Sequence, residues 1–393
     1  MDKKCLPLAG VRVLDLSRLL PGPFCSQILA DFGAEVLKIE DPQAGDYIRW
    51  MPPLLDENSA LYYSVNRGKQ SMKLNLKAEA GREIFNRLIP QYDILLESFR
   101  PGVMDKLGLG YDKLKEINPR LIYCAITGYG QTGPYRDIAG HDLNFLNLAG
   151  ISSLIGPRNE TPDIPGIQIA DIGGGALWGA IAVLLALKAR DVTGEGQMCD
   201  VSMLDGAFSW LAFSLAGYGV DGQAPVRGEG LLNGGYACYN IYPTGDQKYV
   251  AIGAYEFKFW QEFCNRLDRP AYIPNHLDPD TQEAMLADFR ALFQEKTRQE
   301  WLEVFRDTDI CFSPVNSFAE ALQDPQIAAR DMLIQTRRAD KTLYLSGIPA
   351  KLSATPGEVT MEFANHGEQT AAVLQGLGYS PEAVEALKQQ KVI

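Results

Sequence analysis

Two side chains of this sequence could move a proton to and from a carbon atom. His141 stands in the segment GHDLNF, residues 140–145, and Asp171 follows thirty positions later in IADIGGG, residues 169–175. An imidazole and a carboxyl group can remove a proton from one face of a carbon and return a proton to the other face. Taken singly, each residue has a simpler interpretation: a partly buried histidine, and an aspartate that caps the start of a helix. The rest of the sequence must decide between these interpretations.

Other catalytic motifs are missing from the sequence. The first expected strand-to-helix turn reads PGP at residues 21–23, where a dinucleotide-binding fold has GxGxxG, and neither a GxxxxGK loop nor a GxSxG motif occurs. We therefore do not expect nicotinamide, nucleoside triphosphate or serine hydrolase chemistry. The three histidines, His141, His276 and His366, are far apart and form no HExxH motif. We predict no metal site, and we expect His276 and His366 at the surface.

The composition is that of a folded, acidic protein. With 393 residues, of which 46% are hydrophobic, the chain can bury a large core, in two domains or in one large domain with an insertion. The net charge of -12 argues against nucleic acid and membrane surfaces as partners. The seven cysteines form no CxxC pair and the first residues do not read as a signal peptide, so we expect the cytoplasm. The longest apolar run, residues 176–187, has twelve residues, which predicts a buried helix too short to span a bilayer.

Strands alternate with helices in the first third of the chain. We expect strands at residues 10–15, 34–40, 71–76, 93–97 and 121–126, and helices at residues 23–32, 78–89 and 110–117. This alternation predicts an α/β fold with a mainly parallel, doubly wound sheet. Such sheets bind ligands at the carboxyl ends of their strands.

The pattern changes after about residue 220. Strands at residues 236–242 and 249–254 flank a PTGD turn, and three helices follow at residues 257–267, 281–296 and 298–307. Together these segments predict a smaller α+β module. From about residue 340 the chain reads as loop with a strand or two, and Ser380 and Pro381 open a final helix.

Seven short segments together resemble the family III coenzyme A transferases and the α-methylacyl-CoA racemases that share their fold. They are LPGP (20–23), ADFGAEVLKIE (30–40), NRGK (66–69), ESFRPGV (97–103), LGLG (107–110), GYGQTGP (128–134) and LGYS (377–380). The resemblance implies a large Rossmann-like, CoA-binding domain built from residues 1–220 and 336–393. It also implies a small α+β domain inserted at residues 221–335, and two subunits threaded through each other as an interlocked homodimer.

The resemblance does not by itself separate racemases from transferases. Asp171 falls where transferases keep their catalytic aspartate and where racemases keep an acid/base aspartate. The segment around His141 is similar to the racemase motif, whereas transferases similar to the formyl-CoA enzyme usually have a residue there that does not titrate. Glu256 falls where racemases have a glutamate that hydrogen-bonds the catalytic histidine and so fixes its tautomer. Leu20 departs from the glutamine of the formyl-CoA type.

These features predict a racemase or epimerase of 2-methylacyl-CoA thioesters, with His141 and Asp171 as the two proton-transferring groups and Glu256 as the partner of the histidine. We expect the backbone N–H groups of residues 173–175 to stabilise the enolate oxygen. The alternative is a CoA transferase in which Asp171 attacks the thioester and forms an acyl anhydride. A third possibility is a CoA-binding protein without catalysis.

The resemblance also implies a CoA-binding set, with CoA entering as part of the substrate and no tightly bound cofactor. By this resemblance, the residues that contact the nucleotide are Ser98, Phe99, Arg100 and Lys106, and the residue that contacts the pantetheine amides is Asp142. Some racemases carry an arginine where this chain has Asp41, so the phosphates must be held by other residues, for which Arg67 and Lys38 are candidates. The expected partners are an acyl-CoA substrate and a second copy of the chain, without nucleic acid or membrane.

Overall fold

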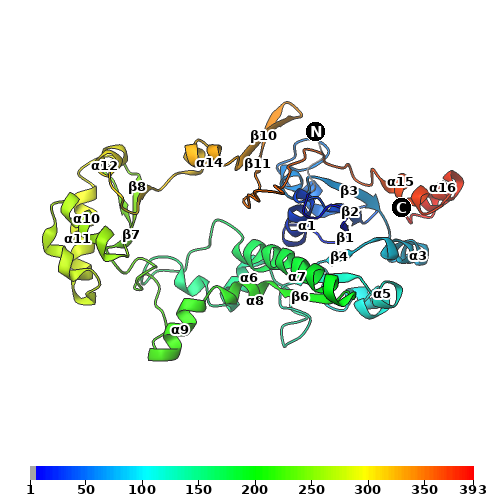
Figure 1. The fold of residues 1–393 in the computed structure, drawn as a ribbon, viewed down its shortest axis with the longest axis horizontal. Coiled ribbons are helices and arrows are strands. Elements are labelled where there is room, and N and C mark those ends of the chain that lie inside the picture. Colours follow the sequence, from blue (N-terminus) through cyan, green and yellow to red (C-terminus); the bar gives the residue numbers. More distant parts are fainter. Residues whose placement is uncertain (1–5) are drawn as a thin grey trace. The chain divides into compact units, whose positions relative to one another are not determined.

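The computed structural model describes residues 6–393 and contains a six-stranded parallel sheet in the order β3-β2-β1-β4-β5-β6 (Figure 1). The strands are β1 (Arg12–Asp15), β2 (Glu35–Glu40), β3 (Lys69–Lys73), β4 (Ile94–Glu97), β5 (Ile122–Thr127) and β6 (Met198–Ser202). Every neighbouring pair is parallel, which confirms the predicted doubly wound α/β sheet. The strand order reverses between β1 and β4, and this switch point is where such sheets bind ligands.

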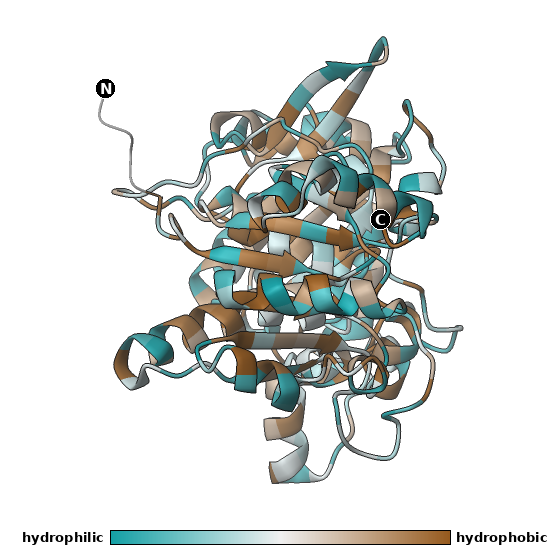
Figure 2. Ribbon diagram, turned by 90° about the vertical axis from the view of Figure 1, so that its right-hand side faces the viewer, coloured by the Kyte–Doolittle hydropathy of each residue, from teal (hydrophilic) through white to brown (hydrophobic). Residues whose placement is uncertain are grey.

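Helices cover both faces of this sheet. On one face lie α1 (Pro21–Asp31) and α7 (Trp178–Thr193), and on the other lie α3 (Glu79–Leu88), α5 (Tyr111–Ile117), α15 (Thr370–Gly376) and α16 (Pro381–Gln389). Because both faces are covered, the central strands β1, β4 and β5 read as mostly apolar runs rather than alternating ones. Several strands carry brown, the hydrophobic colour, in Figure 2, and the outer strands β3 and β6 are more polar. The final helix begins as predicted, with the Ser380 hydroxyl accepting the N–H of Ala383.

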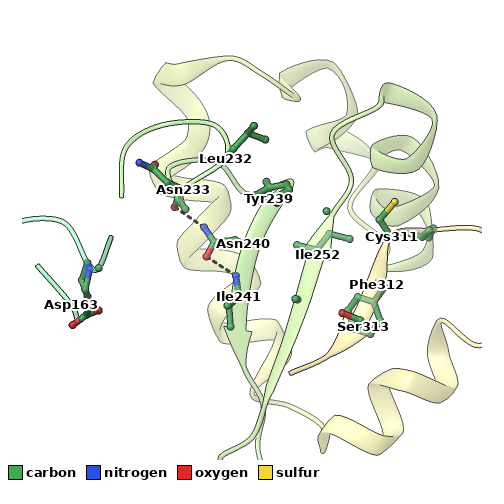
Figure 3. A pocket seen from close by; sticks show the side chains of 16 residues that line it. Asp163, Leu232, Asn233, Tyr239, Asn240, Ile241, Ile252, Cys311, Phe312 and Ser313 are labelled. Atoms are coloured by element: carbon green, nitrogen blue, oxygen red, sulfur yellow. Dashed lines mark hydrogen bonds between the residues drawn. The ribbon is translucent and has the colours of Figure 1, made fainter. Parts of the chain in front are cut away.

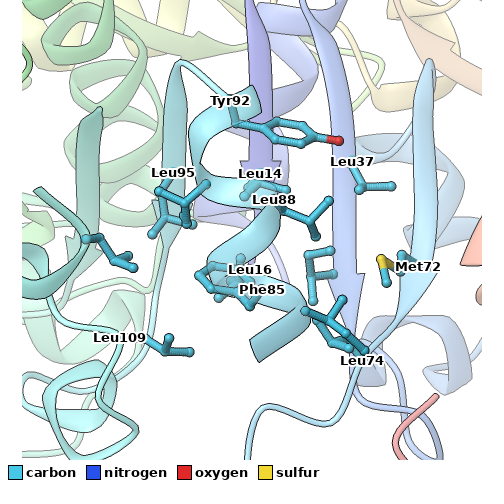
Figure 4. Close-up of a cluster of buried hydrophobic side chains, with 14 of the residues drawn as sticks. Leu14, Leu16, Leu37, Met72, Leu74, Phe85, Leu88, Tyr92, Leu95 and Leu109 are labelled. Atoms are coloured by element: carbon cyan, nitrogen blue, oxygen red, sulfur yellow. The ribbon is translucent and has the colours of Figure 1, made fainter. Parts of the chain in front are cut away.

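A cluster of buried side chains fixes α3 against the sheet (Figure 4). Leu14 and Leu95 from neighbouring strands meet Phe85 and Leu88 from the helix, and all four side chains are at most 2% exposed. Full burial of one such side chain contributes about 1.5–3 kcal/mol. The carboxyl ends of β1 and β4 are therefore held in a fixed relation.

The apolar run that we predicted as a helix too short for a bilayer is part of a longer helix. A π-helix, η4 (Ile169–Leu177), runs directly into α7, and the joined helix Ile169–Thr193 has 25 residues and a mean hydropathy of 1.8 over its most apolar window. By length and composition alone it could cross a membrane, but half of that window is buried inside the structure, as in the core helix of a folded domain. The expected absence of a membrane partner stays a prediction.

Three glycines allow η4 to approach α8 (Met203–Ser209) very closely. A Cβ atom added at Gly174 would lie 2.5 Å from the backbone oxygen of Met203, and one added at Gly173 would lie 2.3 Å from the Trp210 ring. A Cβ atom at Gly206 would in turn lie 2.2 Å from the oxygen of Gly174. Since backbone atoms cannot move aside cheaply, glycine is required at Gly174 and Gly206 for this packing.

Some elements differ from the sequence expectations. Strand β6 was not predicted, and neither was the helix α2 (Ala60–Val65). The stretch that we read as loop with a strand or two contains an antiparallel hairpin, β10 (Leu333–Arg338) with β11 (Lys341–Ser346). Its two turn residues, Ala339 and Asp340, both have positive φ, as a tight hairpin turn requires, but alanine is not a typical residue there. The remaining short helices of the sheet-containing part are α4 (Val103–Lys106) and α6 (Asp142–Leu148).

The described chain divides into two compact units. The first comprises the described residues up to Ala149, Gly166–Trp210 and Ala328–Ile393, and the second comprises Gly150–Pro165 and Leu211–Ile327. The transitions thus lie about ten residues before the predicted borders, and a segment that we assigned to the large domain belongs to the second unit. Arg227 ties this segment in, because its guanidinium donates to the backbone oxygens of Ser153, Pro157 and Glu160.

The second unit contains both strands and helices. Its antiparallel sheet, in the order β7-β8-β9, consists of β7 (Tyr239–Pro243), β8 (Tyr249–Gly253) and β9 (Phe312–Pro314). Its helices are α9 (Ala212–Asp221), α10 (Phe257–Arg266), α11 (Gln282–Phe293), α12 (Arg298–Val304) and α13 (Phe318–Ala321), and α14 (Pro325–Ala329) begins in this unit and ends in the first. His276 is buried here against Trp260 with ring centroids 5.3 Å apart, so its expected surface position is wrong. His366, in the first unit, is half-buried and bonded to the Asp41 carbonyl.

Candidate active site

A pocket of about 570 Å³ lies at the carboxyl ends of β1, β4 and β5, at the switch point of the sheet. Its walls include residues 98–101 after β4, residues 126–129 at the end of β5, and both His141 and Asp171. The structure therefore brings together the two groups that the sequence suggested for proton transfer. All of the lining residues belong to the first unit.

The second unit contains a larger hollow, of about 880 Å³, against the outer face of its small sheet (Figure 3). Tyr239, Ile241 and Cys311 line it, and Asp163 is the only carboxylate among its described lining residues. The pocket at the switch point combines an imidazole with a carboxyl group whose pKa is raised to about 7, and we therefore take it as the candidate active site.

The backbone at His141 is fixed and its side chain is exposed. His141 is the residue that precedes α6, with an extended backbone, and the side-chain oxygen of Asn144 accepts its N–H at 3.0 Å. The two residues form a capping box at the start of this helix, and the His141 side chain lines the pocket. The imidazole can therefore exchange a proton with a molecule bound in the pocket.

Asp171 is the third residue of η4, and a neighbouring carboxylate holds its backbone. One oxygen of Asp142 accepts the N–H of Ala170 at 2.7 Å and the N–H of Asp171 at 2.9 Å. Burial, and secondly the negative charge of Asp142, raise the pKa of Asp171 to about 7. A carboxyl group with this pKa can act both as an acid and as a base near neutral pH.

Three of the five residues expected to bind CoA line the pocket, namely Ser98, Phe99 and Arg100. Asp142 and Lys106 are not among the residues that line it; Asp142 is engaged by the start of η4, and Lys106 is exposed at the end of α4. Their contacts with CoA stay predictions. Glu256, at the start of α10, is exposed and belongs to the second unit, so its pairing with His141 also stays a prediction.

The glycines of η4 have a different role from the one we expected. In a π-helix each backbone N–H bonds to the carbonyl five residues earlier, and Gly173, Gly174 and Gly175 all lie within this helix. They are buried against α8 and are not among the residues that line the pocket. Their N–H groups therefore serve the helix and are not available to an enolate oxygen.

The two expected phosphate-binding residues are also placed elsewhere. Lys38 is fully buried in an ion pair with Asp46 at 3.0 Å, and Arg67 is buried in an ion pair with Asp31 at 2.6 Å. If either cation left its partner to bind a phosphate, a buried carboxylate would remain unpaired, which costs several kcal/mol of stability. The pocket instead contains Arg18, directly after β1; its place after a parallel strand was the sequence signal that could have found it.

Glu97 supports the turn that follows β4. Its carboxylate is 4% exposed and accepts the N–H of Phe99 at 2.7 Å, with the Tyr123 hydroxyl 3.4 Å from the other oxygen. Burial raises its pKa to about 7, and the hydrogen bond from Phe99 only partly offsets this. The residue was not singled out from the sequence, where it reads only as the polar end of a strand.

The comparisons with known proteins agree with this site. The model of CoA-transferase family III matches residues 8–370. The chain belongs to this family. The resemblance seen in the sequence is thereby confirmed, and the protein is a family III enzyme. A solved family III structure, the CAIB/BAIF family protein from Brucella suis, is 32% identical, superposes with a TM-score of 0.82, and is covered over 95% of this chain and 99% of that chain.

The family III relatives of this chain include two kinds of enzyme. The human alpha-methylacyl-CoA racemase is 35% identical over 99% of this chain and 98% of its own. The succinyl-CoA--L-malate CoA-transferase beta subunit of Chloroflexus aurantiacus is 36% identical, again over 99% of this chain and 98% of its own. Because the identities are equal within a percentage point, overall similarity does not separate isomerase from transferase. The geometry of the site has to do so.

The buried carboxyl group of Glu97 should make the stability of this family III enzyme depend on pH. Its pKa is about 7 in the folded protein and about 4.5 in the unfolded chain, so between these values the folded state binds more protons and its stability falls as the pH rises. In Glu97→Gln this loss is absent, and the amide oxygen can still accept the Phe99 N–H. We expect the variant to be more stable than the native protein by about 1–3 kcal/mol above neutral pH.

Urea unfolding at pH about 5 and about 8 measures this difference directly. Glu116→Gln, at an exposed position on α5, is the matched control and should show the same pH dependence as the native protein. A Glu97→Gln variant that is less stable than the native protein at the higher pH would show that the carboxylate is preferred in its charged form.

Proposed function

We propose that this protein is a racemase or epimerase of 2-methylacyl-CoA thioesters. The observation that carries the proposal is the shared pocket of His141 and Asp171, in which the pKa of the carboxyl group is raised to about 7. The similarity to alpha-methylacyl-CoA racemases from human and mouse, at 35% and 36% identity, supports it. The acyl-CoA substrate is likewise part of the proposal.

The reaction needs two proton transfers on opposite faces of one carbon. One of the two groups takes the proton from the carbon next to the thioester carbonyl, and the electron pair of that C–H bond moves into the carbonyl to give an enolate. The other group then donates its proton to the opposite face, which restores the carbonyl with inverted configuration. Each turnover leaves the proton on the group that began without one, so the enzyme is then in the form that acts on the opposite enantiomer until its protons exchange with the solvent.

The raised pKa of Asp171 suits this task. A value of about 7 means that the protonated and the ionised forms of this carboxyl group are both well populated near neutral pH. The ionised form can remove the proton from one enantiomer, and the protonated form can donate a proton to the enolate formed from the other enantiomer. An aspartate with an ordinary pKa near 4 would be protonated in only about one molecule in a thousand at neutral pH.

The alternative is a CoA transferase, and the relatives with this activity support it. In that reaction the Asp171 carboxylate attacks the thioester, forms a mixed anhydride and releases CoA, which a second acid then accepts. His141 would be a binding residue and Glu256 a structural one. The raised pKa disfavours this alternative, because near neutral pH it leaves part of the enzyme with a protonated, non-nucleophilic carboxyl group. A CoA-binding protein without catalysis is a third possibility that the paired titratable groups disfavour.

The remaining expectations are part of the same proposal. We expect CoA to enter only as part of the substrate, with no metal or tightly bound cofactor, and we expect a cytoplasmic enzyme that binds neither nucleic acid nor membranes. The acyl group is not specified further by the residues that line the pocket.

Deuterium exchange distinguishes the two reactions. In heavy water, one enantiomer of a 2-methylacyl-CoA should gain deuterium at the α-carbon and lose optical purity without any second acid. We expect His141→Ala to reduce this exchange by at least about a hundredfold, the usual contribution of a general acid or base. Asn147→Ala, at an exposed position on the same helix outside the pocket, is the control and should exchange at the native rate. Mass spectrometry and chiral chromatography measure both changes.

The transferase alternative predicts the opposite results in the same experiment. The α-hydrogen would stay in place, Asp171→Ala would be severe while His141→Ala would be mild, and turnover would require an acceptor acid. Hydroxylamine would inactivate the enzyme only when acyl-CoA is present, with the modification at Asp171. This set of results would replace the racemase proposal.

The pH dependence provides a second, independent test. Both active forms of a racemase carry one proton on the His141–Asp171 pair, so activity should fall when the pair gains a second proton at low pH and when it loses its proton at high pH. Because the two enantiomers have equal free energies, kcat/KM should follow the same bell-shaped profile in both directions. An Asp171 nucleophile would instead give a profile that rises through pH about 7 and then stays level. Initial rates across this range decide between the profiles.

We also propose that the protein is an interlocked homodimer. Four large apolar side chains of α7, Trp178, Ile181, Leu184 and Leu185, are 41–65% exposed along one side of the helix, and α9 has no buried residue although its sequence is mostly apolar. Exposed apolar surface of this extent is typical of a face covered by another chain. We expect sedimentation at nanomolar concentration to give a dimer that does not separate on dilution, because threaded chains must unfold to part. A folded monomer under these conditions would contradict the proposal.

A further inference from the structure

Arg18 stands between two hollows at the switch point of the sheet. It lines the pocket that contains His141 and Asp171, and it also lines a smaller hollow, of about 140 Å³, formed with Ile39, Asp41 and Leu76. Phe99 is the other aromatic or charged residue that lines both. A molecule that extends from the reacting groups into the smaller hollow must therefore pass this pair of side chains.

The backbone around Arg18 is held on both sides by buried polar groups. The Lys38 ammonium donates to the oxygen of Ser17 at 2.7 Å, the N–H of Arg18 itself donates to the hydroxyl of Ser98 at 3.2 Å, and the N–H of Leu19 donates to Asp46 at 3.2 Å. Three successive residues are thus tied to three different segments of the chain.

This turn also stores strain. Leu19 has a φ of +61°, a left-handed conformation that costs a residue with a side chain about 1–2 kcal/mol. Its anchor, Asp46, is paired with Lys38, and both side chains are 1% exposed. Strained turns that are held by surrounding structure cluster at binding and catalytic sites. Here the strain fixes where the Arg18 side chain leaves the backbone.

The guanidinium of Arg18 is free, in contrast to the buried cations nearby. It lies over the ring of Phe99, 5.1 Å from the centroid, it is exposed, and it forms no ion pair with any of residues 6–393. The neighbouring carboxylate of Asp41 is already engaged, since it accepts the N–H groups of Gln43 and Ala44. In a protein of net charge -12, a fixed and unpaired arginine on a pocket wall is suited to bind an anion, and its planar fork matches a phosphate group.

We propose that Arg18 binds a phosphate group of the CoA nucleotide, with Phe99 holding its guanidinium in place. This inference rests on the proposed acyl-CoA substrate, and it assigns to Arg18 the phosphate contact that Lys38 and Arg67 cannot make. The CoA molecule carries phosphate in two places, the pyrophosphate and the ribose 3′-phosphate. Arg18 can bind either of them, because both are phosphate anions.

Titration calorimetry of the full-length protein with CoA, dephospho-CoA and pantetheine tests the inference without any turnover. We expect Arg18→Ala to weaken CoA binding about 10- to 100-fold, the usual effect of losing a hydrogen bond between charged groups. Pantetheine, which lacks the nucleotide phosphates, should bind as it does to the native protein, and Arg18→Lys should recover part of the CoA affinity. An equal loss for dephospho-CoA assigns Arg18 to the pyrophosphate, and a loss for CoA alone assigns it to the 3′-phosphate.

Arg12→Ala is the matched control. The Arg12 guanidinium also lies over an aromatic ring, that of Tyr92, at 4.4 Å, but it is at the opposite end of β1 and lines neither hollow. This variant should bind CoA with native affinity. The inference is overturned if Arg18→Ala binds CoA as tightly as the native protein, or if it loses pantetheine to the same extent as CoA.

Failure of the proposed reaction would look different. If the native protein binds CoA but catalyses no α-proton exchange, the reaction is wrong and the Arg18 result still decides the inference. If the native protein binds no CoA at all, both the proposed acyl-CoA substrate and the inference about Arg18 are wrong.

Discussion

The geometry of the site depends on one carboxylate that accepts two backbone N–H groups. Asp142 follows His141 directly in the chain, and its oxygen holds the N–H groups of Ala170 and Asp171. The start of one helix is thereby fixed to the start of another, so His141 and Asp171 cannot drift apart independently. Burial is the larger cause of the raised pKa of Asp171, and the same Asp142 carboxylate adds to it. A change at residue 142 would therefore alter both the position of Asp171 and its pKa.

A set of buried charges beneath the pocket supports this arrangement. Asp15 is paired with Lys69, Lys38 with Asp46, and Glu40 with Arg49, all with side chains at most 1% exposed. Burying such pairs contributes little net stability compared with an apolar core. Their value is geometric, because each charged group also bonds a backbone or side-chain partner in the loops after the strands. The Arg49 guanidinium, for example, reaches both Asn58 and the hydroxyl of Tyr62.

The sequence predicted the parallel sheet well because the physical cause is local. Strands covered on both faces must be apolar throughout, and the runs before Asp15 and Glu97 show this directly. It predicted less well where the outcome depends on partners distant in the chain. The position of Arg18 after a strand could have marked it as a pocket residue, but the sequence does not show that Arg67 is buried against Asp31 while the Arg18 guanidinium lies over Phe99. The choice is made by which carboxylates the fold brings near.

The candidate site shows the same division. His141 and Asp171 could be named from their motifs, and the fold places them in one pocket. The role of GGG could not be read, since an approach of two helices and an exposed row of N–H groups require the same residue type. The contribution of Glu97 was hidden for a related reason: burial of a carboxyl group becomes visible only when the elements around it are known.

The wide turns of η4 have a consequence for how this helix can change. A π-helix differs from an α-helix in carrying extra residue length within the same ladder, and an α-helix turns by roughly 100° per residue. The wider turns absorb the extra residue, so the residues on either side keep nearly the phase of an ordinary helix. Removing one residue within α7 would instead rotate everything on the amino-terminal side about the axis by roughly that angle, and the carboxyl group of Asp171 would face a different neighbour. The angular phase of the helix, and not only the identity of its residues, is thus part of what makes the site.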